Sequence, residues 1–209
     1  MNSTPVPDPL TSTPAESANS TKAADNSSKA HDAATRTLAS WRATNPASSG
    51  AQAVGSTDAH ASGGTITEIL RIPALGKNWA QPVYEGVGGQ QLRAGVGHFP
   101  GTEQPGQIGN FAVAGHRSGV AIPAFRDIDR IRTGSTIQVT TAHRITYTYT
   151  VTRVRTVAPT DVNVIAQVPD HPNAAPTKAK LTIVTCWPAT GHAKRVVVEA
   201  DLVSSRGGA

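Results

Sequence analysis

Three residues of types that carry out covalent catalysis stand at the ends of strand-like segments in this 209-residue chain. Cys186, the only cysteine, ends a β-branched segment and is followed by Trp187-Pro188, which cannot continue a central strand. His116 follows a second such segment, and Arg195 begins a third. A thiolate can attack a carbonyl, an imidazole can move protons near neutral pH, and a guanidinium can stabilise an oxyanion. Residues of these three types are able to carry out acyl transfer when they lie together.

Each of the three residues also has an ordinary structural explanation when it is taken alone. A single cysteine is more often a small buried hydrophobe, a histidine after a strand is more often a structural hydrogen-bonding residue, and an arginine at a strand start is more often solvated. Spacing favours function for one pair, because only a short loop separates Cys186 from Arg195. Two strands joined by such a loop lie side by side, so we expect these two residues to be neighbours.

The elements that position these residues belong to the second part of the chain. Residues 1–64 are rich in Ser, Thr, Ala, Asn and Pro and contain only Trp41 of the nine aromatic residues. Such a composition buries too little apolar surface to offset the entropy of ordering, so we expect a disordered tail with a short helical patch around 32–42. Residues 65–203 are expected to form one folded domain, followed by a C-terminal tail at 204–209.

Short β-branched segments separated by Gly, Pro and Asp follow Thr65 and predict an all-β barrel or sandwich. Apolar or aromatic positions alternate with Thr and Arg over 147–154, which indicates a strand with one solvated face. Four prolines between 159 and 177 predict a long connection with a helical turn near 161–166. The expected strands are 66–72, 109–114, 136–141, 145–157, 180–185 and 195–203.

Charge and hydropathy exclude several classes of partner. The tail has four Lys/Arg against five Asp/Glu, and the rest has fifteen against nine, a mild positive field that could favour anionic cell-wall polymers. No basic run is interleaved with aromatic residues, so we expect no nucleic-acid binding. No run of 18 apolar residues occurs, and the N-terminus does not resemble a signal peptide. We therefore expect membrane attachment only through an anchor absent from this chain.

The segment Thr182-Ile183-Val184-Thr185-Cys186 matches the sortase signature Thr-Leu-x-Thr-Cys with Ile183 in place of Leu. The chain resembles sortases, and most closely class E sortases of high-GC Gram-positive bacteria, from Ile66 to Val203. The other motifs that carry the resemblance are 97–102, Pro105-Gly106, 109–117, 159–162 and 195–198.

The resemblance implies an eight-stranded β-barrel with short helical turns, in which His116, Cys186 and Arg195 converge. It also implies a cysteine transpeptidase that cleaves a C-terminal sorting motif, such as Leu-Ala-x-Thr-Gly, after Thr and forms a thioester on Cys186. An amine of a lipid II-like peptidoglycan precursor then accepts the protein. The implied location is the extracellular face of the membrane or the cell wall, where the tail would act as a spacer.

Substrate contacts are expected from Thr185, Val120 and Ala121, although Thr185 could equally be an ordinary β-branched strand residue. In class E sortases the cysteine is often followed by His-Pro, where this chain has Trp187, and the catalytic histidine by a Thr-Thr-Tyr-Gly-like stretch, which is also absent. Cys186 does not begin a helix and so lacks the dipole that lowers a thiol pKa. We expect a minor share of reactive thiolate–imidazolium pair and slow turnover.

Four other histidines are alternative candidates for the catalytic base. His98 lies in a Gly-Pro turn and is expected to be structural, whereas His143 and His171 are expected on surface loops. His192 lies in the loop between Cys186 and the arginine, close enough to touch the site, and is a weaker candidate than His116. No Asp/Glu spacing suggests a glycosidase pair or a calcium loop, and one cysteine excludes a multi-cysteine zinc site. We expect no metal and no cofactor.

Two other functions remain open. L,D-transpeptidases also use His and Cys in a β-rich domain, but their signature places Ser and Gly before Cys and Arg two residues after it, which Thr185 and Pro188 do not match. The second alternative is a catalytically inactive barrel that binds the wall or a pilus, with Cys186 buried. Access of a thiol reagent to Cys186 separates this alternative from an enzyme.

Overall fold

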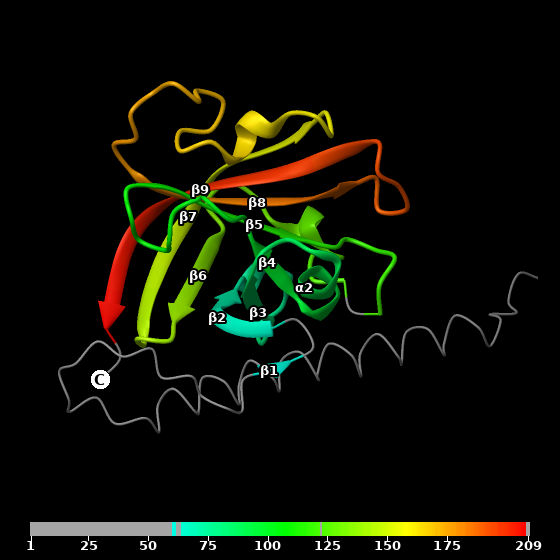
Figure 1. The fold of residues 1–209 in the computed structure, drawn as a ribbon, viewed down its shortest axis with the longest axis horizontal. Coiled ribbons are helices and arrows are strands. Elements are labelled where there is room, and N and C mark those ends of the chain that lie inside the picture. Colours follow the sequence, from blue (N-terminus) through cyan, green and yellow to red (C-terminus); the bar gives the residue numbers. More distant parts are fainter. Residues whose placement is uncertain (1–59, 62–63, 122, 208–209) are drawn as a thin grey trace, which may run out of the picture.

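The computed structural model describes residues 60–61, 64–121 and 123–207, and shows a β-structure with few helical turns (Figure 1). The predicted disordered tail and its helical patch lie outside these residues, apart from 60–61 and 64. The strands are β1 (His60–Ala61), β2 (Gly64–Arg71), β3 (Ala80–Glu85), β4 (Val96–His98), β5 (Gly109–Gly115), β6 (Thr136–Thr141), β7 (Ile145–Val157), β8 (Ala179–Trp187) and β9 (Lys194–Gly207).

The strands form one sheet in the order β1-β2-β3-β4-β5-β8-β9-β7-β6. An additional antiparallel pairing joins β2 to β6, so β2 to β9 close into an eight-stranded barrel. The pairs β3–β4 and β5–β8 are parallel, and the other neighbours are antiparallel. The all-β barrel expected from the sequence is confirmed.

Two barrel strands were not among those predicted from residue patterns. In β3, Pro82 has no backbone N–H to donate and argues against a strand, yet it pairs opposite Ile69. The strand β4 is only three residues long and contains Gly97. Its glycine is required for packing, because a Cβ there would lie 2.3 Å from the Gly86 carbonyl oxygen. Because the β-propensity of both segments is weak, they become strands only through pairing with their neighbours in the closed sheet.

The last strand is longer than predicted. β9 continues to Gly207, well into the segment expected as a C-terminal tail. Its final residues pair with the start of β7, where Gly207 lies opposite Ile145. This ladder satisfies backbone hydrogen-bonding groups even though the side chains of Ser204 and Ser205 are exposed. Because this pairing is between distant segments, composition could not reveal it.

Short helices occupy the connections and carry few core residues. They are η1 (Pro73–Leu75), α2 (Gly89–Ala94), η2 (Ile128–Arg130) and η3 (Val162–Ile165). The helical turn predicted near 161–166 corresponds to η3. No helix among the described residues is long and apolar enough to cross a membrane.

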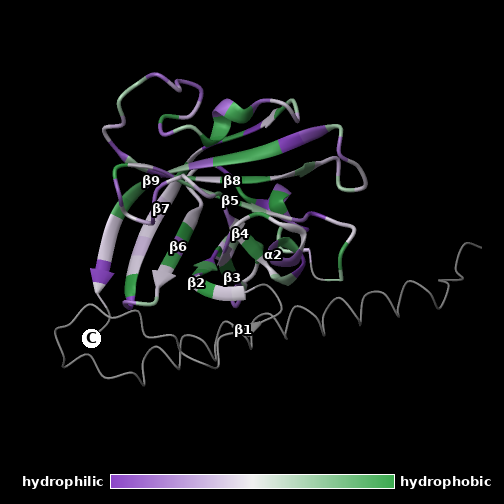
Figure 2. Ribbon diagram, in the orientation of Figure 1, coloured by the Kyte–Doolittle hydropathy of each residue, from purple (hydrophilic) through white to green (hydrophobic). Residues whose placement is uncertain are grey.

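The core fills the barrel interior with side chains from alternate strand positions. Phe111, Tyr149, Leu181 and Ile183 are among the largest fully buried side chains. Figure 2 shows hydrophobic segments along β5, β8 and β9 in the middle of the barrel. In β7 the predicted alternation places Tyr149 and Val151 in the core. It ends at the irregularity between Val151 and Arg153, so Val154 is exposed. Burial of this apolar set is the main source of stability.

The pairing of three strands brings the candidate residues to one end of the barrel. β5 runs parallel to β8 with Ala114 opposite Val184, and β8 runs antiparallel to β9 with Cys186 opposite Arg195. Figure 1 shows β8 and β9 side by side up to the hairpin that joins them. His116 follows the last residue of β5, and therefore lies at the same end as this hairpin.

Candidate active site

Strand parity places His116, Cys186 and Arg195 on the outer face of the barrel. Their strand neighbours Val113, Ile183 and Val196 belong to the core, and side chains alternate between the two faces of a strand. The three candidate residues each lie an odd number of positions from one of these core residues. They consequently lie on the opposite face, at adjacent ends of β5, β8 and β9.

Cys186 is half-buried and is a free thiol. It lies directly across from Arg195 in the β8–β9 ladder, so the short hairpin makes them neighbours. The Arg195 guanidinium is also half-buried, and its Nη1 donates to the His192 carbonyl oxygen at 3.1 Å and to the Lys194 carbonyl oxygen at 3.0 Å. Arg195 thus holds the backbone of the hairpin that follows the cysteine.

His116 is linked to the cysteine strand through the residues that precede each of them. Thr185, only 3% exposed, donates its hydroxyl to the Gly115 carbonyl oxygen at 2.8 Å. This hydrogen bond joins the ends of β5 and β8 just before the imidazole and the thiol. The glycine allows close packing, because a Cβ on Gly115 would lie 2.7 Å from the ring of Phe125.

The electrostatic surroundings of His116 favour its neutral form. Burial lowers the pKa of the His116 imidazole, and the positive charges of Arg93 and His192 lower it further. Within the described residues, the His116 ring makes no hydrogen bond. A neutral imidazole can accept a proton, and one with a lowered pKa is a stronger acid than a free imidazole once it is protonated.

The imidazole of His192 contacts the thiol, as its place in the short loop between Cys186 and Arg195 indicated. Nδ1 of His192 lies 3.4 Å from Sγ of Cys186, within hydrogen-bonding distance for sulfur. His192 is exposed and lies in the hairpin loop between β8 and β9. Its position in that short loop indicated that it lies near Cys186, but the sequence could not show which way its ring points.

The residues that follow His116 and Cys186 also contact each other, a relationship that sequence analysis missed. The guanidinium carbon of Arg117 lies 4.6 Å from the centroid of the Trp187 ring, in cation–π geometry. Arg117 is 5% exposed and forms an ion pair with Asp129. Its Nε and Nη1 atoms are buried without a hydrogen-bond partner. The ion pair with Asp129 and the contact with the Trp187 ring together hold the Arg117 guanidinium in place.

The predicted substrate contacts are divided between two environments. Thr185 is buried and its hydroxyl is used within the protein. Val120 is half-buried and Ala121 is exposed, and both lie in the connection that begins at His116. The start of that connection is fixed by a hydrogen bond from the Phe125 backbone N–H to the His116 carbonyl oxygen at 2.9 Å.

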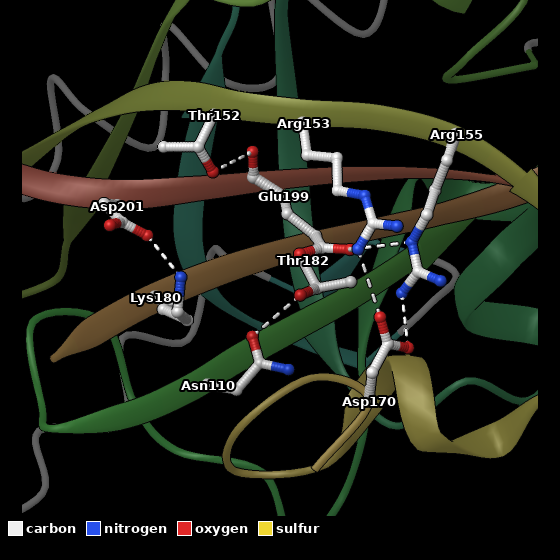
Figure 3. A network of polar contacts seen from close by, with 9 residues as sticks. All are labelled: Asn110, Thr152, Arg153, Arg155, Asp170, Lys180, Thr182, Glu199 and Asp201. Carbon is white, nitrogen blue, oxygen red and sulfur yellow. Dashed lines mark hydrogen bonds and ion pairs between the residues drawn. The ribbon is translucent and has the colours of Figure 1, made fainter. Parts of the chain in front are cut away.

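The long connection between β7 and β8 leaves the barrel beside the site, since Val157 pairs opposite Arg195. Asp170, in this connection, accepts from Arg155 at 2.6 Å and from Arg153 at 3.2 Å (Figure 3). Arg155 also donates to Glu199 of β9 at 2.9 Å. These contacts hold the connection against the outer faces of β7 and β9.

A second set of contacts fixes the connection over β5 and β8. The Asn110 side chain donates to the Ala166 carbonyl oxygen at 3.0 Å. Its own oxygen accepts from the Thr182 hydroxyl at 2.9 Å (Figure 3). Asn110 and Thr182 are fully buried although they lie on the outer face. The connection therefore covers this face beyond the candidate residues, whereas Cys186 keeps partial exposure.

The remaining candidate histidines lie away from Cys186. His98 is buried in the barrel wall, where its Nδ1 lies 2.7 Å from Glu85 and its Nε2 lies 2.9 Å from the Thr102 hydroxyl. His143 and His171 are exposed. The described residues contain no group of three or more His, Cys, Asp or Glu side chains arranged to hold a metal ion.

Comparison with known proteins identifies a family for most of the described chain. The family described as Sortase domain matches residues 70–203. Sortase E from Streptomyces avermitilis is 37% identical, with a TM-score of 0.60 over 68% of this chain and 90% of that one. Sortase E1 from Streptomyces coelicolor, with a tripeptide in its active site, is 28% identical, with a TM-score of 0.60 over 68% of this chain and 90% of that one.

Curated proteins match at lower coverage. Sortase A of Streptococcus agalactiae is 29% identical over 125 residues, which are 58% of this chain and 47% of that protein. The chain spans about half the length of the curated relatives it matches.

Proposed function

This chain belongs to the sortase family, and from that premise we propose that it is a class E-type cysteine transpeptidase with Cys186 as nucleophile. The observation that carries the proposal is the register that sets Cys186 opposite Arg195, with His116 at the end of the adjacent parallel strand. An inactive wall-binding barrel would be expected to bury its cysteine. Partial exposure of Cys186 instead favours the enzyme.

The first half-reaction forms a thioester. Sγ of Cys186 attacks the carbonyl carbon of the substrate threonine, and the C–S bond forms as the C–N bond breaks. An imidazolium gives the departing amine its proton, a role that suits His116 because its lowered pKa makes the protonated ring a better acid. Arg195 stabilises the oxyanion with N–H groups other than those that hold the hairpin.

The second half-reaction transfers the acyl group to an amine. The entering amine attacks the thioester, loses a proton to the neutral imidazole, and releases Cys186 as a thiolate. The thiolate–imidazolium pair is thereby restored, and no cofactor is consumed. Because Cys186 lies in a strand and not at a helix N-terminus, only a minor share of enzyme holds this pair at neutral pH, and turnover is slow.

The proposed substrate is the C-terminal sorting signal of a secreted protein, with a Leu-Ala-x-Thr-Gly-like motif cleaved after Thr. The acceptor is an amine of a lipid II-like peptidoglycan precursor, which places the enzyme at the cell surface. Val120 and Ala121 are proposed peptide contacts, because their connection begins at His116. Thr185 is proposed to act as a positioning residue through its hydrogen bond to Gly115.

The test incubates the protein with a Leu-Ala-x-Thr-Gly peptide and triglycine and follows masses of protein and peptide. Wild type should gain the mass of the acyl fragment and release a transfer product, whereas Cys186→Ala should do neither. His143→Ala, which removes an exposed histidine from the β6–β7 turn, should behave as wild type. Absence of both acyl-enzyme and product in wild type would overturn the proposed function.

A further inference from the structure

The imidazole within hydrogen-bonding distance of the Cys186 thiol is that of His192. Its Nδ1 lies 3.4 Å from Sγ, while the described residues offer the His116 ring no hydrogen bond. In a thiol–imidazole pair the sulfur donates its proton to the nitrogen, and in the ionised pair the nitrogen donates to the thiolate. Either form fits this geometry, because both use the same two atoms.

The hairpin holds His192 in place by its backbone. The Arg195 guanidinium donates to the His192 carbonyl oxygen at 3.1 Å, and the Gly191 N–H donates to the Pro188 carbonyl oxygen at 3.1 Å. Both ends of the loop are fixed by the β8–β9 ladder, with Cys186 opposite Arg195. The ring is therefore presented to the thiol by a braced turn of only a few residues.

The charged and titratable groups near His192 belong to β8, β9, α2 and the end of β5. Its ring contacts Cys186 of β8, Arg195 of β9 donates to its carbonyl oxygen, and Lys194 begins β9 two residues along the chain. The positive charges of Arg93 in α2 and of His192 both act on His116. Because the charge of His192 lowers the pKa of the His116 imidazole, a proton held on His192 disfavours a second proton on His116.

We propose that His192 is a further catalytic residue, which accepts the Cys186 proton and so forms the reactive thiolate–imidazolium pair. The inference rests on the proposed function, in which Cys186 is the nucleophile. The S–H bond breaks and an N–H bond forms at Nδ1, so the net charge does not change. In the first half-reaction this proton passes from His192 to His116 and leaves with the departing amine, and in the second the entering amine gives a proton to His116, which returns it to His192. His116 then serves the departing and entering amines.

The test measures the rate of Cys186 alkylation by iodoacetamide from pH 5 to pH 9. His192→Gln keeps a polar side chain of similar size but cannot hold the proton. We expect it to move the midpoint of the profile upward by about one pH unit, and to lower the rate at pH 7 about tenfold. His143→Gln is the matched control and should overlay wild type. His116→Gln should abolish peptide transfer while changing the alkylation profile less than His192→Gln does.

Two outcomes would overturn the inference: a His192→Gln profile that overlays wild type, or a larger displacement in His116→Gln. Thiolate absorbance at 240 nm, titrated in wild type and His192→Asn, checks the result with a second variant and without a reagent. Acyl-enzyme formation by wild type is followed in parallel by mass. If wild type never acylates, the proposed function fails; if it acylates and the His192 variants keep the wild-type profile, only the role of His192 fails.

Discussion

The guanidinium of Arg117 lies against the ring of Trp187, with 4.6 Å between its central carbon and the ring centroid. These residues directly follow His116 and Cys186, so the contact links the two segments that carry the imidazole and the thiol. The Thr185–Gly115 hydrogen bond links the residues that directly precede them. The segments that carry His116 and Cys186 are therefore joined both before and after these residues, by a hydrogen bond between β5 and β8 and by the contact of Arg117 with Trp187.

Replacement of Trp187 by Leu should remove the cation–π contact with Arg117. A desolvated cation–π contact contributes up to about 2 kcal/mol, and without the ring Arg117 keeps only its ion pair to Asp129. We expect Trp187→Leu to lower the free energy of unfolding in urea by about 1 kcal/mol. Acylation should slow several-fold with KM little changed, because alignment and not binding is affected. Trp187→Phe keeps a ring and should recover most of both losses; equal values for the Leu and Phe variants would contradict this role.

Replacement of Thr185 by Val removes its hydrogen bond to Gly115 while the shape of the side chain stays the same. The Thr185 hydroxyl is buried and donates to Gly115 at 2.8 Å, so its loss should cost about 1–2 kcal/mol of stability. The acylation rate should fall because the end of β5 that carries His116 is no longer tied to β8. Thr185→Ser retains the donor and should acylate close to the wild-type rate. If the Val variant acylates at the Ser variant's rate, the hydrogen bond does not position the pair.

Asp170 should control the order of the β7–β8 connection. Its backbone has a φ of 67°, which Asn tolerates well, so Asp170→Asn removes the charge without backbone strain. Loss of the ion pairs to Arg155 and Arg153 should speed amide exchange in residues 159–177 roughly fivefold, as expected for about 1 kcal/mol. Exchange in β5 should not change. Asp127→Asn, at an exposed carboxylate, is the control, and unchanged exchange in the connection would contradict the anchoring role.

Glu68 should make stability depend on pH away from the site. Burial raises the pKa of its carboxyl from 4.5 to about 7, partly offset by the hydrogen bond from Thr67 and the charge of His98. The folded state therefore binds the proton more tightly than the unfolded state. This contribution to stability is fully present below pH 4.5 and is lost as pH rises through about 7.

Glu68→Gln should remove that dependence. The shift from 4.5 to about 7 corresponds to roughly 3 kcal/mol as an upper bound, so the variant should be more stable than wild type at pH 8 by up to that amount. Gln can still accept the Thr67 hydrogen bond. Urea unfolding at pH 5, 6, 7 and 8 measures the difference. A constant offset between wild type and variant across this range would show that Glu68 does not titrate there.

Most of the fold could be predicted from local pattern because solvated and buried strand faces alternate with a period of two. The segments 136–141 and 145–157 were predicted with the boundaries that the structure has. β3 and β4 were missed because Pro82 and Gly97 are poor strand formers, and only neighbouring strands in the closed barrel supply their partners. The extension of β9 to Gly207 likewise depends on pairing with the distant start of β7.

For the site, the sequence by itself determined the residue types and the strand ends at which they stand. Cys186, His116 and Arg195 could be named because a signature and a strand ending are local properties of the chain. Tertiary structure decided that His192 turns its ring to the thiol and that Arg117 packs on Trp187. It also decided that Asp170 ties a long connection to β7. Such contacts depend on strand register and side-chain direction across the closed barrel, which no local pattern in the chain specifies.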